Sequence, residues 1–243
     1  MARSGARVGL VTGGARRLGA ECARALARRG FHMAIHHRRS FDEAAALVTE
    51  IEDGGGSAHA FPFDLLAPNA PSDLVDAVVA RFGRLDVLVN SAASMLRTPV
   101  GTVTADQLDE IFALNVRAPF LAAQAAARHM APGSVIVNMA DLAAFETWAG
   151  YIPHAMSKAA VVQMTRALAK TLAPDIRVNA IAPGIVLLPE GWDAASADRL
   201  AATTPLQRHG TPADVVRALE YLLDATFVTG EILLVDGGRQ VRR

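Results

Sequence analysis

The chain has 243 residues, with 24 basic and 24 acidic side chains and a formal net charge of zero. This balance argues against a nucleic-acid footprint and against a broad basic surface for membranes. Hydrophobic residues make up 51% and charged residues 20%, which is typical of a globular protein and not of a disordered one. The length suits one domain with a sizeable core.

Cysteine usage and hydropathy set the expected compartment. Cys22 is the only cysteine, so no internal disulfide can form, and this fits a reducing cytoplasm. No apolar run approaches the roughly 20 residues that a membrane span needs. The seven histidines lack acidic or cysteine partners at ligand spacing, so we expect no metal site.

Strand-like and helix-like segments alternate along the whole chain. The expected strands are 7–12, 32–37, 58–61, 85–90, 134–139, 176–181 and 231–235. The expected helices are 17–29, 42–52, 71–82, 105–130, 153–172 and 212–224. Residues 105–130 are expected to form one long helix with a bend at Pro119, and residues 187–205 an irregular, mobile flap rich in small residues.

This alternation predicts the fold class. Repeated βα units with short connections give a parallel sheet with right-handed crossovers and helices on both faces. No linker or low-complexity segment interrupts the pattern. We therefore expect residues 1–243 to form a single Rossmann-type α/β domain, with a doubly wound sheet of about seven strands.

The first strand is followed by a glycine-rich turn that opens a helix. The turn reads Gly13-Gly14-Ala15-Arg16-Arg17-Leu18-Gly19. Small residues let the backbone approach a pyrophosphate, and the helix N-terminus supplies free N–H groups and a positive dipole end. The order of strand, loop and helix predicts a dinucleotide site.

The end of the second strand indicates which dinucleotide is bound. A protein specific for NAD tends to place an acid there, which accepts from the ribose hydroxyls. Here the stretch is His36-His37-Arg38-Arg39-Ser40. Guanidinium groups and a hydroxyl suit a 2′-phosphate, and Arg16 and Arg17 add charge to the same rim. The sequence therefore predicts NADP(H).

These residues carry a family pattern. The chain resembles the short-chain dehydrogenase/reductase family over nearly its whole length, and within it the pteridine reductases and dihydromonapterin reductases. Arg17 stands at the middle glycine of the family loop, as in the pteridine reductase branch. The stretch 36–40 and the chain ending, from Phe227-Val228-Thr229-Gly230 to Asp236-Gly237-Gly238-Arg239, resemble the same branch.

The resemblance implies further contacts in chain order. Asp64 and Leu65 match the pair beside the adenine, and Asn90-Ser91-Ala92-Ala93 stands where Asn-Asn-Ala-Gly is usual. Pro183-Gly184-Ile185 matches the segment beside the nicotinamide. Asn115 matches the asparagine that holds a water of the proton relay. The predicted cofactor contacts are Gly13, Arg16, Arg17, Leu18, Gly19, His37, Arg38, Arg39, Ser40, Asp64, Leu65, Asn90, Ala92, Lys158, Pro183, Gly184 and Ile185.

The catalytic segment departs from the family at one position. The family uses Tyr-x-x-x-Lys, in which the lysine lowers the tyrosine pKa and holds the nicotinamide ribose. Lys158 has the matching context, but His154 stands four residues before it. Asp141 lies thirteen residues before His154, where the family has Ser and the pteridine reductases have Asp. Tyr151 is nearby, and we interpret it as structural.

Histidine 154 is a candidate proton donor. Residues i and i+4 share a helix face, so His154 and Lys158 can reach one substrate atom. Imidazole titrates near pH 6.5 in model compounds, so imidazolium is a competent acid. Asp141 would orient the ring and favour its charged form, whereas Lys158 and the oxidised nicotinamide would oppose that charge. The predicted catalytic residues are Asp141, His154, Lys158 and Asn115.

The predicted substrate contacts are Arg17, Met95, Asp141, His154 and Trp192. Pteridine reductases place an aromatic ring where Met95 stands, and methionine lacks that stacking face. Trp192, in the predicted flap, is a candidate aromatic wall or a hydrophobic plug that closes the flap.

Three hypotheses on function stay open. The first is an NADPH-dependent reductase of a pteridine-like or carbonyl compound, and the second is an NADP(H)-binding sensor or partner subunit without catalysis. The third is a structural subunit of an oligomer. The Ala-rich helices expected at 105–130 and 153–172 resemble those the family uses in dimers and tetramers, so we expect a homo-oligomer with a small-molecule substrate.

Overall fold

The computed structural model describes residues 5–187 and 194–241. Its strands are β1 (Val8–Thr12), β2 (His32–His37), β3 (Ala58–Pro62), β4 (Val87–Asn90), β5 (Ser134–Met139), β6 (Ile176–Pro183) and β7 (Ile232–Val235). Its α-helices are α1 (Arg17–Arg28), α2 (Phe41–Asp53), α3 (Ala70–Phe82), α4 (Ala105–Phe112), α5 (Ala118–Ala127), α6 (Ile152–Leu172), α7 (Ala194–Ala201) and α8 (Pro212–Asp224).

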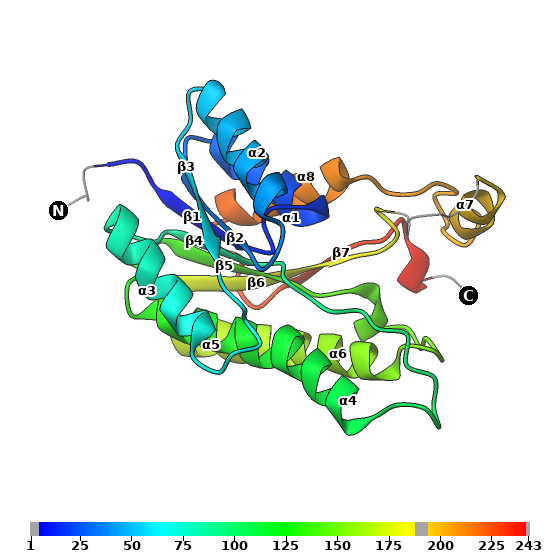
Figure 1. Cartoon of the computed structure of the whole chain (residues 1–243). Coiled ribbons are helices and arrows are strands. Elements are labelled where there is room, and N and C mark those ends of the chain that lie inside the picture. The colour runs from blue at the N-terminus through cyan, green and yellow to red at the C-terminus, as the bar shows by residue number, and fades with distance from the viewer. Residues whose placement is uncertain (1–4, 188–193, 242–243) are drawn as a thin grey trace.

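In the described ranges, one parallel sheet of seven strands runs in the order β3-β2-β1-β4-β5-β6-β7. Helices α1, α2 and α8 cover one face, and α3, α4, α5 and α6 cover the other (Figure 1). The central strands are buried on both faces, which explains their continuous apolar sequences. The α/β Rossmann-type fold predicted from the sequence is therefore confirmed.

The strand order indicates where a ligand-binding cleft is expected. The chain turns one way from β1 to β2 and β3, and the other way to β4 and β5. In an open parallel sheet, ligands bind outside the carboxyl ends of the strands at such a reversal. The loops after β1, β2, β4 and β5 converge there.

Two expectations about helices were wrong. Residues 105–130 do not form one helix bent at Pro119, because a π-helical turn, Ala113–Arg117, separates α4 from α5. The flap at 187–205 is not wholly irregular, because Ala194–Ala201 form α7. Within the described ranges, no helix is both long and apolar enough to cross a membrane.

Candidate active site

A cleft of about 580 Å³ opens at the carboxyl ends of β1, β2, β4 and β5. Most of the residues predicted to contact the cofactor line it: Gly13, Arg16, Arg17, Leu18, Gly19, His37, Arg38, Arg39, Ser40, Asp64, Leu65, Ala92, Lys158, Pro183 and Gly184. The candidate substrate residues Met95, Asp141 and His154 line the same cleft. The fold thus brings together side chains that lie more than 100 positions apart.

Three predicted site residues do not line the cleft. Asn90 is buried, and its Nδ2 donates to Asn138 Oδ1 at 2.9 Å, so it joins β4 to β5. Ile185 accepts a hydrogen bond from Gly210 N at its carbonyl oxygen (2.9 Å). Asn115 lies behind the cleft in the π-helical turn. Trp192 lies outside the described residues.

The loop between β1 and α1 is shaped by two glycines. Gly13 has φ +63°, and a Cβ there would lie 3.0 Å from Ala92 Cα. A Cβ on Gly19 would lie 2.1 Å from the carbonyl oxygen of Gly13, so the first turn of α1 packs directly on the loop. No side chain of the described residues caps the N-terminus of α1. The small residues and the uncapped helix end fit a bound pyrophosphate.

Arg17, the first residue of α1, also has a positive φ of 50°. Non-glycine residues rarely adopt this left-handed conformation, because Cβ approaches the following carbonyl oxygen. The resemblance places Arg17 at a family glycine, and the backbone here keeps a conformation that glycine favours. Arginine at this position therefore supplies a guanidinium group, but its backbone is strained where that of glycine would not be.

The four arginines of the rim differ in their partners. Arg16 lies 3.6 Å from Glu43, and Arg38 lies 3.0 Å from Asp64. Within the described part of the chain, no carboxylate lies within ion-pair distance of Arg17 or Arg39. These two guanidinium groups are the ones left for a phosphate.

His37 also lines the cleft, and one of its ring nitrogens has no hydrogen-bond partner among the described residues. Its ring packs edge-on against Phe41, and its Nδ1 is buried without a hydrogen-bond partner in the described ranges. Burial lowers the pKa of His37, with Glu43 opposing the shift, so the ring is neutral near pH 7. A buried polar atom without a partner on a cleft wall fits a ligand hydroxyl or phosphate oxygen.

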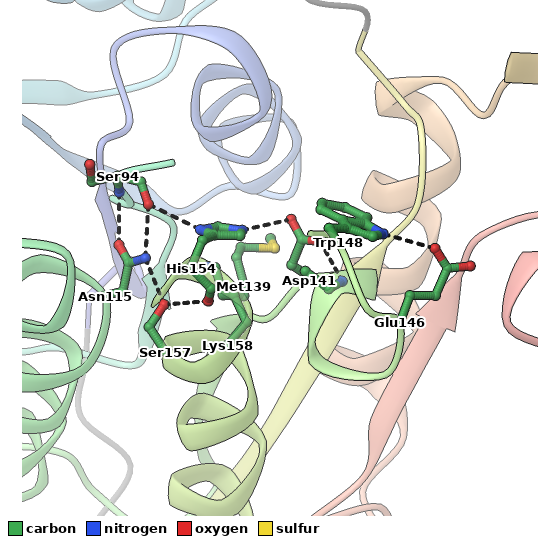
Figure 2. Close-up of polar contacts among 10 residues, drawn as sticks. Ser94, Asn115, Met139, Asp141, Glu146, Trp148, His154, Ser157 and Lys158 are labelled. Carbon is green, nitrogen blue, oxygen red and sulfur yellow. Dashed lines mark hydrogen bonds and ion pairs between the residues drawn. The ribbon is translucent and has the colours of Figure 1, made fainter. Parts of the chain in front are cut away.

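Asp141 and His154 form a pair at the other end of the cleft (Figure 2). Asp141 directly follows the loop residue after β5, and its Oδ1 accepts from Ala143 N at 2.8 Å. Its Oδ2 lies 3.5 Å from His154 Nε2. His154 is 2% exposed, whereas the Asp141 side chain is 25% exposed. The carboxylate therefore faces the cleft more openly than the imidazole does.

The ring orientation of His154 follows from its partners. Nδ1 lies 3.1 Å from the Ser94 carbonyl oxygen, which can only accept, so Nδ1 carries a hydrogen. Nε2 is buried and lacks a hydrogen-bond partner in the described ranges. With Nδ1 bound to Ser94, Nε2 is the ring nitrogen that faces Asp141.

Ser94 and Ser157 are site residues that the sequence analysis missed. Asn115 binds the Ser94 backbone twice: Oδ1 accepts from Ser94 N (2.7 Å) and Nδ2 donates to Ser94 O (2.9 Å). Nδ2 also donates to Ser157 Oγ (2.9 Å), which donates to His154 O (2.7 Å). The i, i+3 spacing of His154 and Ser157 could have revealed the helical contact, but the Ser94 contact needed the fold.

Lys158 lies one turn further along α6, on the same face. Its side chain is buried, and Nζ donates to the carbonyl oxygen of Met139 at 2.7 Å. Burial lowers the pKa of Lys158 to about 8, and the carboxylate of Asp141 opposes that shift. The site thus holds a cation, a carboxylate and an imidazole within one end of the cleft.

The loop from Asp141 to His154 is tied to the end of the chain. Trp148 Nε1 donates to Glu146 Oε2 at 2.9 Å (Figure 2), and Arg239 Nη2 lies 3.1 Å from the same carboxylate. Met95 is half exposed on the cleft wall. The Glu146–Arg239 pair could not be predicted from local sequence patterns, because 93 positions separate the two residues.

Comparisons with known proteins agree with this geometry. The family model described as enoyl-(acyl carrier protein) reductase matches residues 13–240. The putative ketoacyl reductase 2 of the granaticin polyketide synthase, from Streptomyces violaceoruber, is 37% identical and 96% of each chain is covered.

Two solved structures share the fold closely. A blue fluorescent protein from a metagenomic library, in complex with NADPH, is 36% identical, with a TM-score of 0.90 and coverage of 96% of this chain and 97% of that one. The alternative dihydrofolate reductase 1 (FolM) of Brucella canis, complexed with NADP, is 33% identical, with a TM-score of 0.92 and coverage of 98% and 95%. The chain therefore belongs to the short-chain dehydrogenase/reductase family and is an oxidoreductase of that type.

Proposed function

We propose that the chain is an NADPH-dependent reductase that transfers hydride to a carbonyl compound or to a pteridine-like (dihydropterin) substrate. One observation carries the proposal: a single cleft joins Arg17 and Arg39, which have no carboxylate partner among the described residues, to the Asp141–His154 pair and Lys158. NADPH, when bound along this cleft, would supply the hydride. The Ser40 hydroxyl, Arg17 and Arg39 would hold its 2′-phosphate, and the α1 N-terminus its pyrophosphate.

The proton in this proposal comes from the Asp141–His154 pair. Reduction of C=O or C=N places a hydride on carbon and needs a proton on oxygen or nitrogen. His154 Nδ1–H stays bound to the Ser94 carbonyl oxygen, so the transferable proton sits at Nε2, 3.5 Å from Asp141 Oδ2. Because Nε2 is buried and Asp141 is partly exposed, Asp141 touches the substrate and His154 holds the proton behind it.

The two substrate classes rest on different relatives. The granaticin relative is described as a ketoacyl reductase, which supports a carbonyl substrate. The Brucella canis structure is described as a dihydrofolate reductase, which supports a reduced pteridine. Met95, Asp141 and His154 would line the substrate end of the cleft for either class.

A second candidate function follows from the same histidine. Nε2 is buried without a hydrogen-bond partner in the described ranges, and the ring is bound on its other side to Ser94. A proton held there is remote from a substrate atom. The alternative is an NADP(H)-binding protein with little or no catalysis, acting as a sensor or partner subunit.

One experiment separates the two functions. NADPH binding is measured first by fluorescence titration, and NADPH oxidation is then followed at 340 nm with dihydrobiopterin, dihydromonapterin and a panel of ketones. The reductase proposal expects turnover by the wild type and at least tenfold less in Asp141→Asn, with unchanged NADPH affinity. His59→Gln, at an exposed position of β3, is the matched control for the histidine variants.

The variant His154→Tyr decides between the alternatives. A binding protein without catalysis should bind NADPH, turn over nothing in the panel and gain activity in this variant. A wild type that is active and loses activity in His154→Phe supports the histidine as the proton carrier. NADPH binding without turnover by either the wild type or His154→Tyr would overturn the reductase proposal.

A further inference from the structure

His36, the residue before the end of β2, is a buried residue of the cleft wall, next to His37, Arg38, Arg39 and Ser40. The residue is 3% exposed, and both of its ring nitrogens face backbone atoms of the protein. Gly13 N donates to His36 Nδ1 at 2.9 Å, and His36 Nε2 lies 3.0 Å from the carbonyl oxygen of Phe63. The ring therefore connects the phosphate loop after β1 to the segment after β3.

These two partners determine the form of the ring. A peptide N–H can only donate, so Nδ1 must present its lone pair to Gly13. A carbonyl oxygen can only accept, so Nε2 must carry the hydrogen that Phe63 receives. Only the neutral imidazole protonated at Nε2 satisfies both contacts, because a second proton on Nδ1 would face the Gly13 N–H.

The backbone of His36 binds the adjacent residue of the loop. Gly14 N donates to the carbonyl oxygen of His36 at 2.8 Å. Two consecutive amides at the start of the loop are thus bound by one residue, and no side chain of the described residues caps the α1 N-terminus that follows. The conformation of the loop at Gly13 is fixed from both sides, since Ala92 packs where a Cβ would lie.

We propose that His36 is a positioning residue for the cofactor: its neutral, Nε2-protonated ring holds the Gly13 amide and so preorganises the phosphate loop. The effect on NADPH affinity rests on the proposed function, whereas the state of the ring and of the Gly13 amide does not. Preorganisation raises affinity because a loop that is already ordered loses less conformational entropy when the cofactor binds.

Two substitutions split the two contacts of the ring. The amide oxygen of His36→Asn reaches the place of Nδ1 and can still accept from Gly13. The amide nitrogen of His36→Gln reaches the place of Nε2 and can still donate to Phe63, but Gly13 loses its acceptor. His32→Gln, on the same strand and away from the cleft, is the matched control.

The first measurement needs no cofactor. Long-range ¹⁵N NMR of the imidazoles should show the Nε2-protonated tautomer for His36 at pH 7, and the Gly13 amide should be protected from hydrogen exchange. Protection should persist in His36→Asn and be lost in His36→Gln. A cationic or Nδ1-protonated ring in the wild type, which needs no variant to fold, would overturn the proposal.

The second measurement is NADPH affinity. We expect His36→Gln to weaken binding about tenfold and His36→Asn less than about threefold, since one hydrogen bond separates them. His32→Gln should bind like the wild type. Equal affinities in the two His36 variants would contradict the positioning role. A wild type with the expected tautomer but no NADPH binding would contradict the proposed function instead.

Discussion

Among single residues, Lys158 places a charge in a buried position, and no carboxylate of the described residues is in ion-pair contact with it. Its ammonium donates to the Met139 carbonyl oxygen, and Asp141 acts on it from further away. The pKa of Lys158 is lowered to about 8 because burial penalises the charged form. Charge burial of this kind weakens the folded state, which suggests that Lys158 serves function and not stability.

The first prediction concerns the pH dependence that Lys158 imposes. Folded Lys158 releases its proton near pH 8 and the unfolded lysine near its ordinary value, so the unfolded state binds more protons between them. The free energy of unfolding should therefore rise with pH from 8 towards 10.5, by about 2 kcal/mol relative to Lys158→Met. Urea denaturation at pH 7.5 and 10 measures this difference. A constant difference between the two proteins would refute it.

The second prediction concerns His36, whose pKa is lowered in the folded protein, so that the neutral ring is favoured. Burial lowers the pKa of His36 to about 4; the nearby His37 lowers it as well, and the Phe63 carbonyl oxygen and Asp64 oppose the shift. The unfolded state binds more protons between pH 6.5 and 4, so the free energy of unfolding should fall as the pH falls through this window. We expect a loss of about 2 kcal/mol that His36→Asn lacks. Urea denaturation of the two proteins at pH 7, 5.5 and 4.5 measures this difference. Equal losses of unfolding free energy in both proteins would contradict the prediction.

The third prediction separates strain from charge at Arg17. Arg17→Gly removes both the left-handed strain at φ 50° and the guanidinium. We expect higher stability, by up to about 1 kcal/mol, because relief of strain is only partly offset by glycine entropy. NADPH affinity should fall about tenfold. Arg17→Gln keeps the strained backbone, so its NADPH affinity should fall as much as that of Arg17→Gly while its melting temperature does not rise. Equal melting temperatures of the two variants would show that strain at Arg17 does not lower stability.

Among elements, the π-helical turn Ala113–Arg117 shows what the sequence could not reveal. The apolar and alanine-rich pattern of 105–130 predicts a continuous helix, and Pro119 was the visible irregularity. The widened turn lies just before Pro119 and presents Asn115 to Ser94 and Ser157. These partners come from a loop after β4 and from α6, so only the tertiary contacts explain the local geometry.

The fourth prediction tests this turn through Asn115→Leu, which keeps the shape and removes every hydrogen bond. The Ser94 N–H loses its acceptor, so we expect a loss of about 2–3 kcal/mol in unfolding free energy. Turnover should fall more than NADPH affinity, since Ser94 also fixes the His154 ring. Gln124→Leu, on the exposed side of α5, is the control. Unchanged turnover in Asn115→Leu would show that the turn does not hold His154.

For the whole molecule, the sequence predicted most where one local rule decides the outcome. The strands followed from short apolar runs, with bounds that differ from the structure by at most two residues, and the cleft followed from the order of strands and the loop at Gly13. Side-chain contacts were not predictable in this way: His36 and His37 both line the cleft, yet both ring nitrogens of His36 face backbone partners, whereas His37 Nδ1 has no partner in the described ranges. The pairing of Glu146 with Arg239 likewise depends on the packing of distant segments.

The layer formed by α3, α4, α5 and α6 has a groove on its outer face that bears on the assembly of the protein. A groove on α4, the π-helical turn and α5 is lined by Phe112, Val116 and Phe120, and Phe120 is 42% exposed. Asp109 and Arg117 border the same groove and offer both signs of charge. A self-complementary patch of this kind suits a two-fold contact between identical chains. We propose that a second copy of the chain covers this groove.

The fifth prediction follows from that groove. Phe120→Glu places a charge at the centre of the proposed contact, so light scattering after size exclusion should show a smaller particle than the wild type. Tyr221→Glu, on the exposed side of α8 across the sheet, introduces the same charge into a half-exposed aromatic site and should leave the mass unchanged. A wild type that runs as a monomer would refute the assembly. A Phe120→Glu variant with the wild-type mass would move the contact to another face.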